Sequence, residues 1–330
     1  MELSRKYGWV VAILTLLSVA SMTGCQQMEP KDEVTVKTAW VHTVEWSGFY
    51  AAQEKGYYAD ENLKVNLVPG RGEPIEEVAS GEIEFGTSTG TGLVLARKAG
   101  EPVKAVATVM RQSPLVVLSL ADSGITKPED LAGKTVSVAS PDLSTGWDVQ
   151  LLTLLEEAGI DRDDVNLVST GFGIDPLVTG EIDAMGFAWS ANGGMEAQLA
   201  GHDVNMIFMS DYGILEYPNA IFTAEQMIEE NSDVIERFVR ATLKGYQYAI
   251  ENPDEVVEFA LERNDSLDPE LQAASMDAFV PLIDSGDAPI GWMDAEVWQS
   301  TQSILVDQAF IDSPVEPSLL YTNEFVEAAQ

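Results

Sequence analysis

Cysteine and histidine are almost absent from this sequence. Among its 330 residues there is one cysteine, Cys25, and there are two histidines, His42 and His202. Disulfide frameworks and four-ligand zinc sites built from histidine and cysteine need more of these residues than the chain supplies. A cysteine–histidine nucleophile pair would depend on Cys25 alone, and neither histidine lies near it in the sequence. We therefore expect no metal and no cofactor.

Basic residues are also scarce. The chain has 18 Lys and Arg against 54 Asp and Glu, a formal net charge of −36. Such a surface repels the phosphates of nucleic acids and anionic lipid headgroups. We expect no nucleic-acid partner, and we interpret the charge as a solvated acidic coat.

No hydrophobic run is long enough to cross a bilayer. The apolar run at residues 9–20 follows Arg5 and Lys6 and precedes Met22-Thr23-Gly24-Cys25. A basic start, a short apolar core and small residues before a cysteine resemble a bacterial lipoprotein signal. This predicts a leader over 1–25, lipidation of Cys25 and a polar tether over 26–33. A plain signal peptide with an incidental cysteine is the alternative.

Glycine divides the remaining chain into two similar copies. Strand-like runs alternate with helical stretches at residues 34–110, and the same order returns at 135–209. Val65 and Val165 are 100 positions apart, and the phrase Gly81-Glu82-Ile83-Glu84 returns as Gly180-Glu181-Ile182-Asp183. Strands and helices alternate in any α/β chain, but the constant offset favours two copies of one unit, each with a mainly parallel sheet.

Two apolar stretches flank the second copy, at residues 115–120 and 206–212. If both are strands between the copies, the hinge has two strands. This predicts lobe 1 over 34–119 and 213–330 and lobe 2 over 120–212. Helices predicted near 232–250, from Pro253 onward, and near 269–283, 294–309 and 323–329 would make lobe 1 the larger lobe.

Several phrases together resemble a known family. They are Trp40, Gly48-Phe49-Tyr50-Ala51-Ala52, Lys55-Gly56-Tyr57-Tyr58, Gly81-Glu82-Ile83-Glu84-Phe85-Gly86 and Asp130-Leu131-Ala132-Gly133-Lys134. They are similar to the nitrate/sulfonate/taurine-binding and thiamine-pyrimidine-synthase-like group. The resemblance implies an α/β, type II periplasmic-binding-protein fold, export, and delivery of a small solute to ABC permease subunits in the membrane.

The group also contains enzymes, the pyrimidine synthases. These have a histidine where Trp46 stands here, and a cysteine-rich motif that this chain lacks. We therefore expect a binding protein and no enzyme.

Ligands of open parallel sheets lie beyond the carboxyl ends of the strands. In lobe 1 this favours the loop with Trp40, His42, Glu45 and Trp46, and the loop with Ser88 and Thr89; in lobe 2 it favours Ser144, Thr145, Trp147 and Trp189. Arg111 and Tyr212 lie near the predicted crossings. Each of these residues also has an alternative role. A tryptophan could pack in the core of its own lobe instead of stacking on a planar ring. A hydroxyl could cap a helix without contacting a ligand, and Arg111 could form a salt bridge.

These candidates predict a cleft for a planar heteroaromatic nutrient. We rank a riboflavin-like vitamin slightly ahead of a thiamine pyrimidine precursor, with a sulfonate or nitrate ligand as the alternative. Two alternative hypotheses belong to other functional classes: an enzyme, namely a pyrimidine synthase, and a sensor module. We expect a monomer that is held on the outer face of the cell membrane by its N-terminal lipid.

Overall fold

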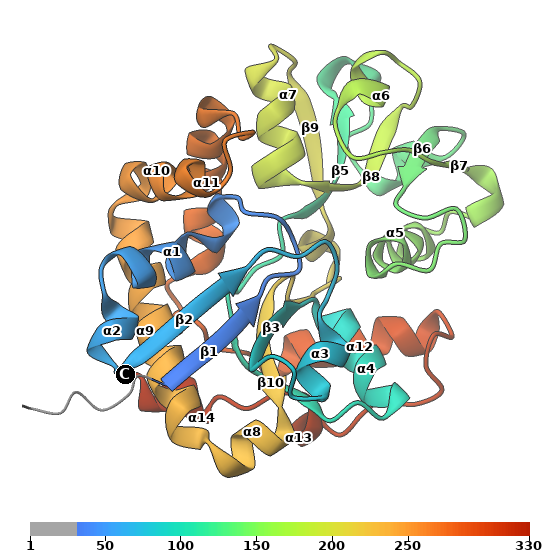
Figure 1. Cartoon of the computed structure of the whole chain (residues 1–330). Coiled ribbons are helices and arrows are strands. Elements are labelled where there is room, and N and C mark those ends of the chain that lie inside the picture. Colours follow the sequence, from blue (N-terminus) through green and yellow to red (C-terminus); the bar gives the residue numbers. More distant parts are fainter. Residues whose placement is uncertain (1–31) are drawn as a thin grey trace, which may run out of the picture. The chain divides into compact units, whose positions relative to one another are not determined.

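Two five-stranded sheets organise the protein in the computed structural model, which describes residues 32–330 (Figure 1). The predicted leader, the predicted lipidation of Cys25 and most of the predicted tether fall outside these residues. The first sheet contains β1 (Asp32–Lys37), β2 (Leu63–Val68), β3 (Phe85–Ser88), β4 (Val103–Thr108) and β10 (Ala220–Ala224). The second contains β5 (Leu115–Leu120), β6 (Thr135–Val138), β7 (Asn166–Ser169), β8 (Ala184–Trp189) and β9 (Val204–Phe208).

The two sheets share one topology. Their strand orders are β2-β1-β3-β10-β4 and β7-β6-β8-β5-β9, so β6 to β9 repeat the places of β1 to β4. In each sheet one strand, β10 or β5, runs antiparallel to both of its neighbours. The α/β fold with two mainly parallel sheets, expected from the repeat, is confirmed.

The repeated sequence, residues 81–84 and 180–183, has the same structural role in both copies. The Glu84 carboxylate accepts a hydrogen bond of 2.7 Å from a backbone N–H of β1, and Asp183 accepts one of 2.8 Å from β6. Gly81 and Gly180 both have a φ of 74°, which ends the preceding helix in a left-handed conformation. The internal similarity in sequence therefore reflects a shared local structure.

The predicted lobe boundary is wrong at one strand. Residues 115–119 belong to β5, which pairs with β8 and β9 in the second sheet, whereas the sequence predicts them in lobe 1. The chain therefore crosses at 109–114 and 213–219, outside regular strands. The two crossings are joined directly, since the Val109 N–H donates to the Asn219 carbonyl at 2.8 Å.

Helices cover both sheets. In lobe 1 they are α1 (Ser47–Glu54), α2 (Tyr57–Asp60), α3 (Ile75–Ala79), α4 (Gly90–Ala99), α8 (Glu225–Glu230), α9 (Ser232–Glu251), α10 (Pro253–Arg263), α11 (Pro269–Ile283), α12 (Ala295–Asp307), α13 (Pro317–Leu320) and α14 (Glu324–Ala328). In lobe 2 they are α5 (Gly146–Glu157), α6 (Asp175–Val178), a π-helix (Ser190–Gly194) and α7 (Met195–Leu199). Within residues 32–330, no helix combines the length and the apolar character needed to cross a membrane.

The α1 helix packs closely on α9. A β-carbon at Gly245 would lie 2.1 Å from the carbonyl oxygen of Gly48, so the two backbones approach as only glycines allow. Phe238 of α9 stacks on Phe85 of β3 with ring centroids 4.0 Å apart. These contacts form the main core of lobe 1.

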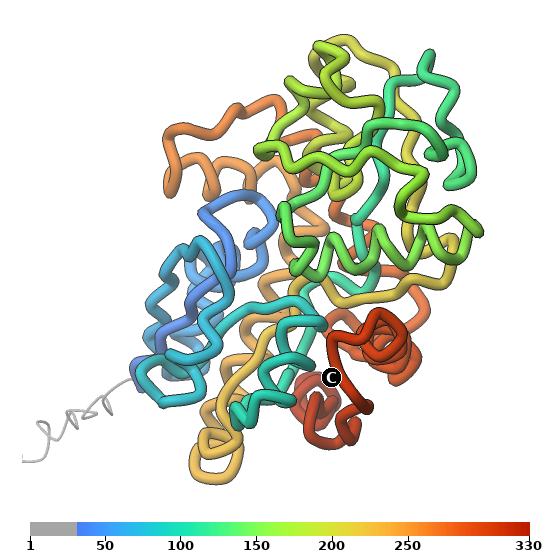
Figure 2. The backbone as a smooth tube through the Cα atoms, turned by 90° about the vertical axis from the view of Figure 1, so that its right-hand side faces the viewer, coloured from blue at the N-terminus to red at the C-terminus, as the bar shows by residue number. Residues whose placement is uncertain are grey.

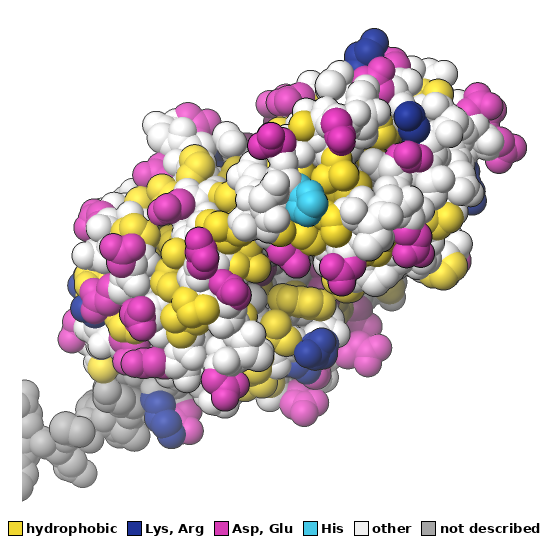
Figure 3. Space-filling model, turned by 90° about the horizontal axis from the view of Figure 1, so that it is seen from above, with side chains coloured by type: hydrophobic (Ala, Val, Ile, Leu, Met, Phe, Trp, Pro, Cys, Tyr) yellow, Lys and Arg dark blue, Asp and Glu magenta, His cyan; other side chains and the backbone are white. Residues whose placement is uncertain are grey.

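Helices of lobe 1 also contact lobe 2. The α12 helix packs on α5, and Gln308 donates to Glu156 at 2.8 Å, while α11 packs on the π-helix. In Figure 2 the red C-terminal segment lies beside the teal α4, and the contacts of α12 and α13 with α4 agree. The described surface in Figure 3 carries Asp and Glu over its whole face, with few Lys and Arg among them.

Candidate ligand-binding site

A cavity of about 610 Å³ lies between the two lobes. Its walls come from loops that follow β1, β2 and β3 in lobe 1 and β6, β7 and β8 in lobe 2, together with the crossing at 213–219. These are the carboxyl ends of the parallel strands, where open α/β sheets bind ligands. The volume is in the range of small-molecule sites.

Trp40 stands at the end of β1 on a loop that is tied down on both sides. Its carbonyl oxygen accepts hydrogen bonds from the Thr38 hydroxyl at 2.7 Å and from the Gly70 N–H at 3.3 Å. The Ala39 N–H donates to the Thr87 hydroxyl at 2.7 Å. The backbone that carries the indole is therefore held by the loop after β2 and by strand β3.

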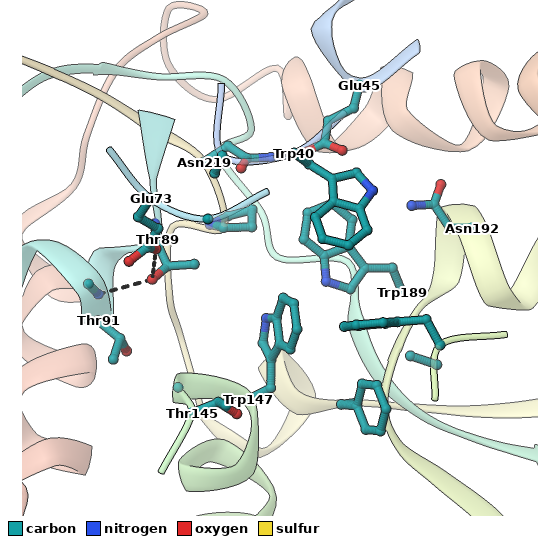
Figure 4. A pocket seen from close by; sticks show the side chains of 18 of the residues that line it. Trp40, Glu45, Glu73, Thr89, Thr91, Thr145, Trp147, Trp189, Asn192 and Asn219 are labelled. Atoms are coloured by element: carbon teal, nitrogen blue, oxygen red, sulfur yellow. Dashed lines mark hydrogen bonds between the residues drawn. The ribbon is translucent and has the colours of Figure 1, made fainter. Parts of the chain in front are cut away.

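Lobe 2 contributes an aromatic cluster. The rings of Trp147 and Phe187 are stacked with centroids 6.3 Å apart and an interplanar angle of 12°. Phe172 stands nearly perpendicular to both, at 6.0 Å and 5.6 Å. Figure 4 shows Trp40, Trp147 and Trp189 pointing into the same space. Together these rings give the cavity flat apolar faces of the kind on which a planar ring stacks.

Trp189 and Asn192 lie where β8 passes into the π-helix. The Trp189 ring meets Phe279 of α11 edge-on, with centroids 6.4 Å apart, and both Trp189 and Asn192 line the cavity. The turn is tightly enclosed, since a β-carbon at Gly194 would lie 2.3 Å from the end of the Met206 side chain. Single π-helical turns are frequent at functional sites.

Glu45 and Asn219 form the polar end of the cavity. The Asn219 amide donates to the Glu45 carboxyl at 2.6 Å, and Glu45 is only 4% exposed. Burial raises the pKa of Glu45 to about 7, against the opposing effect of the Asn219 and Thr43 hydrogen bonds. A carboxyl with this pKa can accept or donate a hydrogen bond near neutral pH.

Acidic groups outnumber basic ones along the wall. Glu45, Glu73 and Glu196 line the cavity, and Arg71 is the lining residue of opposite charge. Burial is the main cause, and Asp175 a lesser one, of a raised pKa for Glu196. The lining offers acceptors for N–H groups of a ligand more than donors for an anion.

Seven of the twelve predicted contact residues line this cavity. They are Trp40, Glu45, Thr89, Ser144, Thr145, Trp147 and Trp189. Thr145 also caps α5 by accepting a hydrogen bond of 3.2 Å from the Asp148 N–H, and Thr89 caps α4 in the same way. The structure thus brings residues from both lobes together, and their contact with a ligand stays a prediction.

Trp46 is the clearest correction. We expected it to stack on a ligand, but its side chain is fully buried in the core of lobe 1 and does not line the cavity. Its indole N–H donates to the Val41 carbonyl at 3.1 Å. The short helical turn at Val44–Trp46 leads directly into α1 and directs the ring inward.

Four other predicted residues also lie outside the lining. The His42 ring is hydrogen-bonded to Tyr50 at 3.0 Å, and the Ser88 hydroxyl donates to the Thr89 carbonyl at 3.1 Å. Arg111 forms ion pairs with Asp287 and Asp294 in a separate, smaller cavity behind the crossings. Tyr212 ends a short helix with its ring at the surface.

The predicted set lacks several residues that line the cavity, among them Phe172, Glu73, Asn192 and Asn219. Phe172 had a usable signal, because it stands between two glycines directly after a strand, at the edge of the sheet where ligands bind. Glu73 and Asn219 had none, since their positions depend on contacts with distant segments. No group of three or more His, Cys, Asp or Glu suited to a metal ion occurs in residues 32–330.

Comparison with known proteins places the chain in a family. Residues 43–256 match the NMT1/THI5 like family, which is more than half of the sequence. The chain belongs to this family. It is 31% identical to the formylaminopyrimidine-binding protein of Halalkalibacterium halodurans, over 92% of this chain and 95% of that protein. It is 25% identical to the riboflavin-binding protein RibY of Chloroflexus aurantiacus, over 89% and 86% of the two chains.

The fold has solved counterparts. The periplasmic aliphatic sulphonate-binding protein SsuA from Escherichia coli superposes with a TM-score of 0.70 over 87% of this chain and 91% of its own, at 16% identity. At this identity the likeness establishes the fold. The periplasmic-binding-protein architecture expected from the sequence is thereby confirmed.

Proposed function

We propose that this protein is the substrate-binding lipoprotein of an ABC importer, and that it captures a small planar heteroaromatic nutrient between its lobes. The observation that carries the proposal is the cavity between the lobes, which has Trp40 on one side and Trp147, Phe172, Phe187 and Trp189 on the other. Burying such a ring removes apolar surface from water on both of its faces.

The polar lining supports a ring with N–H groups at its edge. Glu45 and Asn219 lie at one end of the cavity, and Asn192 and Glu196 line it from lobe 2. An aminopyrimidine presents a ring nitrogen beside an amino group, which suits a carboxyl that can both donate and accept. The polar lining therefore reverses the order expected from the sequence, and we rank a pyrimidine precursor of thiamine ahead of a riboflavin-like vitamin, in agreement with the relative at 31% identity.

Export and anchoring complete the proposal. The basic start, apolar run and Cys25 support a lipid-anchored protein on the outer face of the cell membrane, where it delivers its ligand to permease subunits. The protein acts as a monomer and catalyses no reaction. Mass spectrometry of the mature N-terminus tests the anchor: an acylated Cys25 supports it, and an unmodified cysteine within a longer chain contradicts it.

Isothermal titration calorimetry of the purified protein tests the ligand class. The panel consists of 4-amino-5-hydroxymethyl-2-methylpyrimidine, N-formyl-4-amino-5-aminomethyl-2-methylpyrimidine, riboflavin and taurine. Binding of at least one ring compound, with a change in tryptophan emission, supports the proposal. Tight binding of taurine without binding of any ring compound contradicts it and favours the sulfonate alternative.

A further inference from the structure

The first turn of α4 faces the cavity, and such a helix end ordinarily attracts anions. Thr89, Thr91 and Gly92 of this turn line the cavity wall. The first backbone N–H groups of a helix have no partner within the helix, and the helix dipole adds partial positive charge at the same end. A phosphate, sulfonate or carboxylate of a ligand would find these groups attractive if they were free.

The chain's own groups already occupy these donors. The Thr89 N–H donates to the Glu73 carboxylate at 2.7 Å, and the Thr91 N–H donates to Glu216 at 2.7 Å. The Gly90 N–H donates to a backbone carbonyl at 2.8 Å, and the Gly92 N–H to the Thr89 hydroxyl at 3.0 Å. Two of the four acceptors are carboxyl groups, and burial raises the pKa of the Glu216 carboxyl to about 7.

Of these two carboxyl groups, Glu73 is the one on the cavity wall (Figure 4). It also accepts a hydrogen bond of 2.8 Å from the Thr89 hydroxyl, so one carboxylate oxygen receives two donors. A β-carbon at Gly92 would lie 2.1 Å from the other oxygen of Glu73. The helix start is therefore shaped to admit this side chain, which comes from the loop after β2.

Lobe 2 also holds a carboxylate where a loop enters a helix, at the start of α5 after β6. The buried Asp148 carboxylate accepts hydrogen bonds from the Ala139 and Ser140 N–H groups, at 2.7 Å and 3.1 Å. It also accepts one of 2.7 Å from the Thr145 hydroxyl. The loop between β6 and α5 thus has its own N–H groups bound by a carboxylate of the chain, as the start of α4 has.

We infer that Glu73 is a specificity-determining residue, whose carboxylate fills the anion position at the start of α4 and makes the cleft select neutral or cationic ligands over anionic ones. This inference rests on the proposed function. The inference concerns the charge of the ligand, which the aromatic walls of the cavity do not determine. Arg71 lines the same region and has no ion pair within residues 32–330, so it is the remaining attraction for an anion.

Two ligands with one ring and different charge test the inference. We compare 4-amino-5-hydroxymethyl-2-methylpyrimidine with 4-amino-2-methylpyrimidine-5-carboxylate, by calorimetry at pH 8, on the wild type and on Glu73→Ala. The wild type is expected to bind the alcohol at least about tenfold more tightly than the carboxylate. Glu73→Ala is expected to gain about tenfold in affinity for the carboxylate, and Glu73→Gln to gain less because its side chain still fills the space.

Glu76→Ala is the matched control, since Glu76 lies three residues away on α3, is exposed and does not line the cavity. It should leave the preference unchanged. An unchanged preference in Glu73→Ala, with an intact thermal melt, overturns the inference.

A titration with methanesulfonate separates this inference from the proposed function. If no ring compound binds to the wild type, the proposed function fails. Methanesulfonate binding by Glu73→Ala, absent in the wild type and in Glu76→Ala, still supports the role of Glu73. If the wild type, Glu73→Ala and Glu76→Ala all bind methanesulfonate equally, or if none of them binds it, the proposed role of Glu73 is overturned.

Discussion

Trp40 and Phe172 meet across the cleft, with ring centroids 5.6 Å apart and an interplanar angle of 57°. Trp40 follows β1 in lobe 1, and Phe172 follows β7 in lobe 2. Phe172 is 66% exposed, the most exposed of the large hydrophobic side chains in residues 32–330. An apolar ring left in water beside a cavity gains most when a ligand covers it.

Replacing Phe172 should therefore weaken binding. Phe172→Ala removes one aromatic wall and the contact with Trp40, a loss of about 1 kcal/mol, or about fivefold in Kd. Calorimetry with the best ligand of the panel measures the change. Phe310→Ala is the control, because Phe310 is also an exposed ring but lies outside the cavity lining. Equal Kd values for the two variants would contradict a role for Phe172 in the site.

Trp46 should affect stability and leave affinity unchanged. Trp46→Phe removes buried volume and the hydrogen bond to Val41, which should lower the free energy of unfolding by about 1–3 kcal/mol. Urea unfolding measures the loss, and titration of the folded variant should give a Kd close to that of the wild type. A large loss of affinity with unchanged stability would restore Trp46 to the site.

The buried Glu45 predicts a specific pH dependence of stability. Its pKa rises from the ordinary 4.5 to about 7, so the folded protein keeps this proton where the unfolded chain has lost it. The stabilisation is complete below about pH 4.5 and is lost as pH rises through 7; its size is up to about 3 kcal/mol. The neighbouring Tyr50 and Tyr246 stay protonated in this range, because their pKa values are raised by burial.

Glu45→Gln should lack this dependence. Between pH 4.5 and 7, the wild type should lose free energy of unfolding relative to Glu45→Gln, while Glu76→Gln should follow the wild type. Denaturant unfolding at several pH values measures these differences. If the free energy of unfolding varied with pH in the same way for the wild type and Glu45→Gln, the pKa of Glu45 would not be raised by folding.

Arg111 is expected to stabilise the loop behind the crossings without touching the ligand. Its guanidinium is buried and pairs with Asp287 and Asp294, whose carboxylates are partly in solvent. Arg111→Met should lower the free energy of unfolding by about 1–3 kcal/mol, less than for a fully buried pair. The Kd should change less than twofold. A tenfold weaker ligand affinity with an unchanged melting temperature would place Arg111 in the binding site.

The repeat was predictable because its signals are local. Glycines end helices wherever a left-handed residue is needed, and apolar runs recur at a constant offset, so the order of strands and helices follows from neighbouring residues. The sheet to which a strand belongs is a long-range property. Residues 115–120 form an apolar run that could have joined either sheet, and only the pairing of β5 with β8 and β9 decides.

The sequence predicts which loops form the site, because these loops follow the strands, but it predicts less well which side chains of the loops face the cavity. Trp40 and Trp46 lie six residues apart in one loop, and nothing in the loop's composition tells which ring faces the cavity. The difference arises because a helical turn starts at Val44 and packs Trp46 beneath α1. Glu73 meets Thr89 only after β2 and β3 have taken their places beside β1, so no sequence motif marks their contact.

A crystal structure with the tightest ligand of the panel tests the central claim most directly. The account predicts a planar ring between the lobes, in contact with Trp40 and Trp189 and with a polar edge at Glu45, while the Glu73 carboxylate stays on the Thr89 N–H. A ligand bound elsewhere on the protein, or a ligand anion on the first turn of α4 with Glu73 displaced, would contradict it.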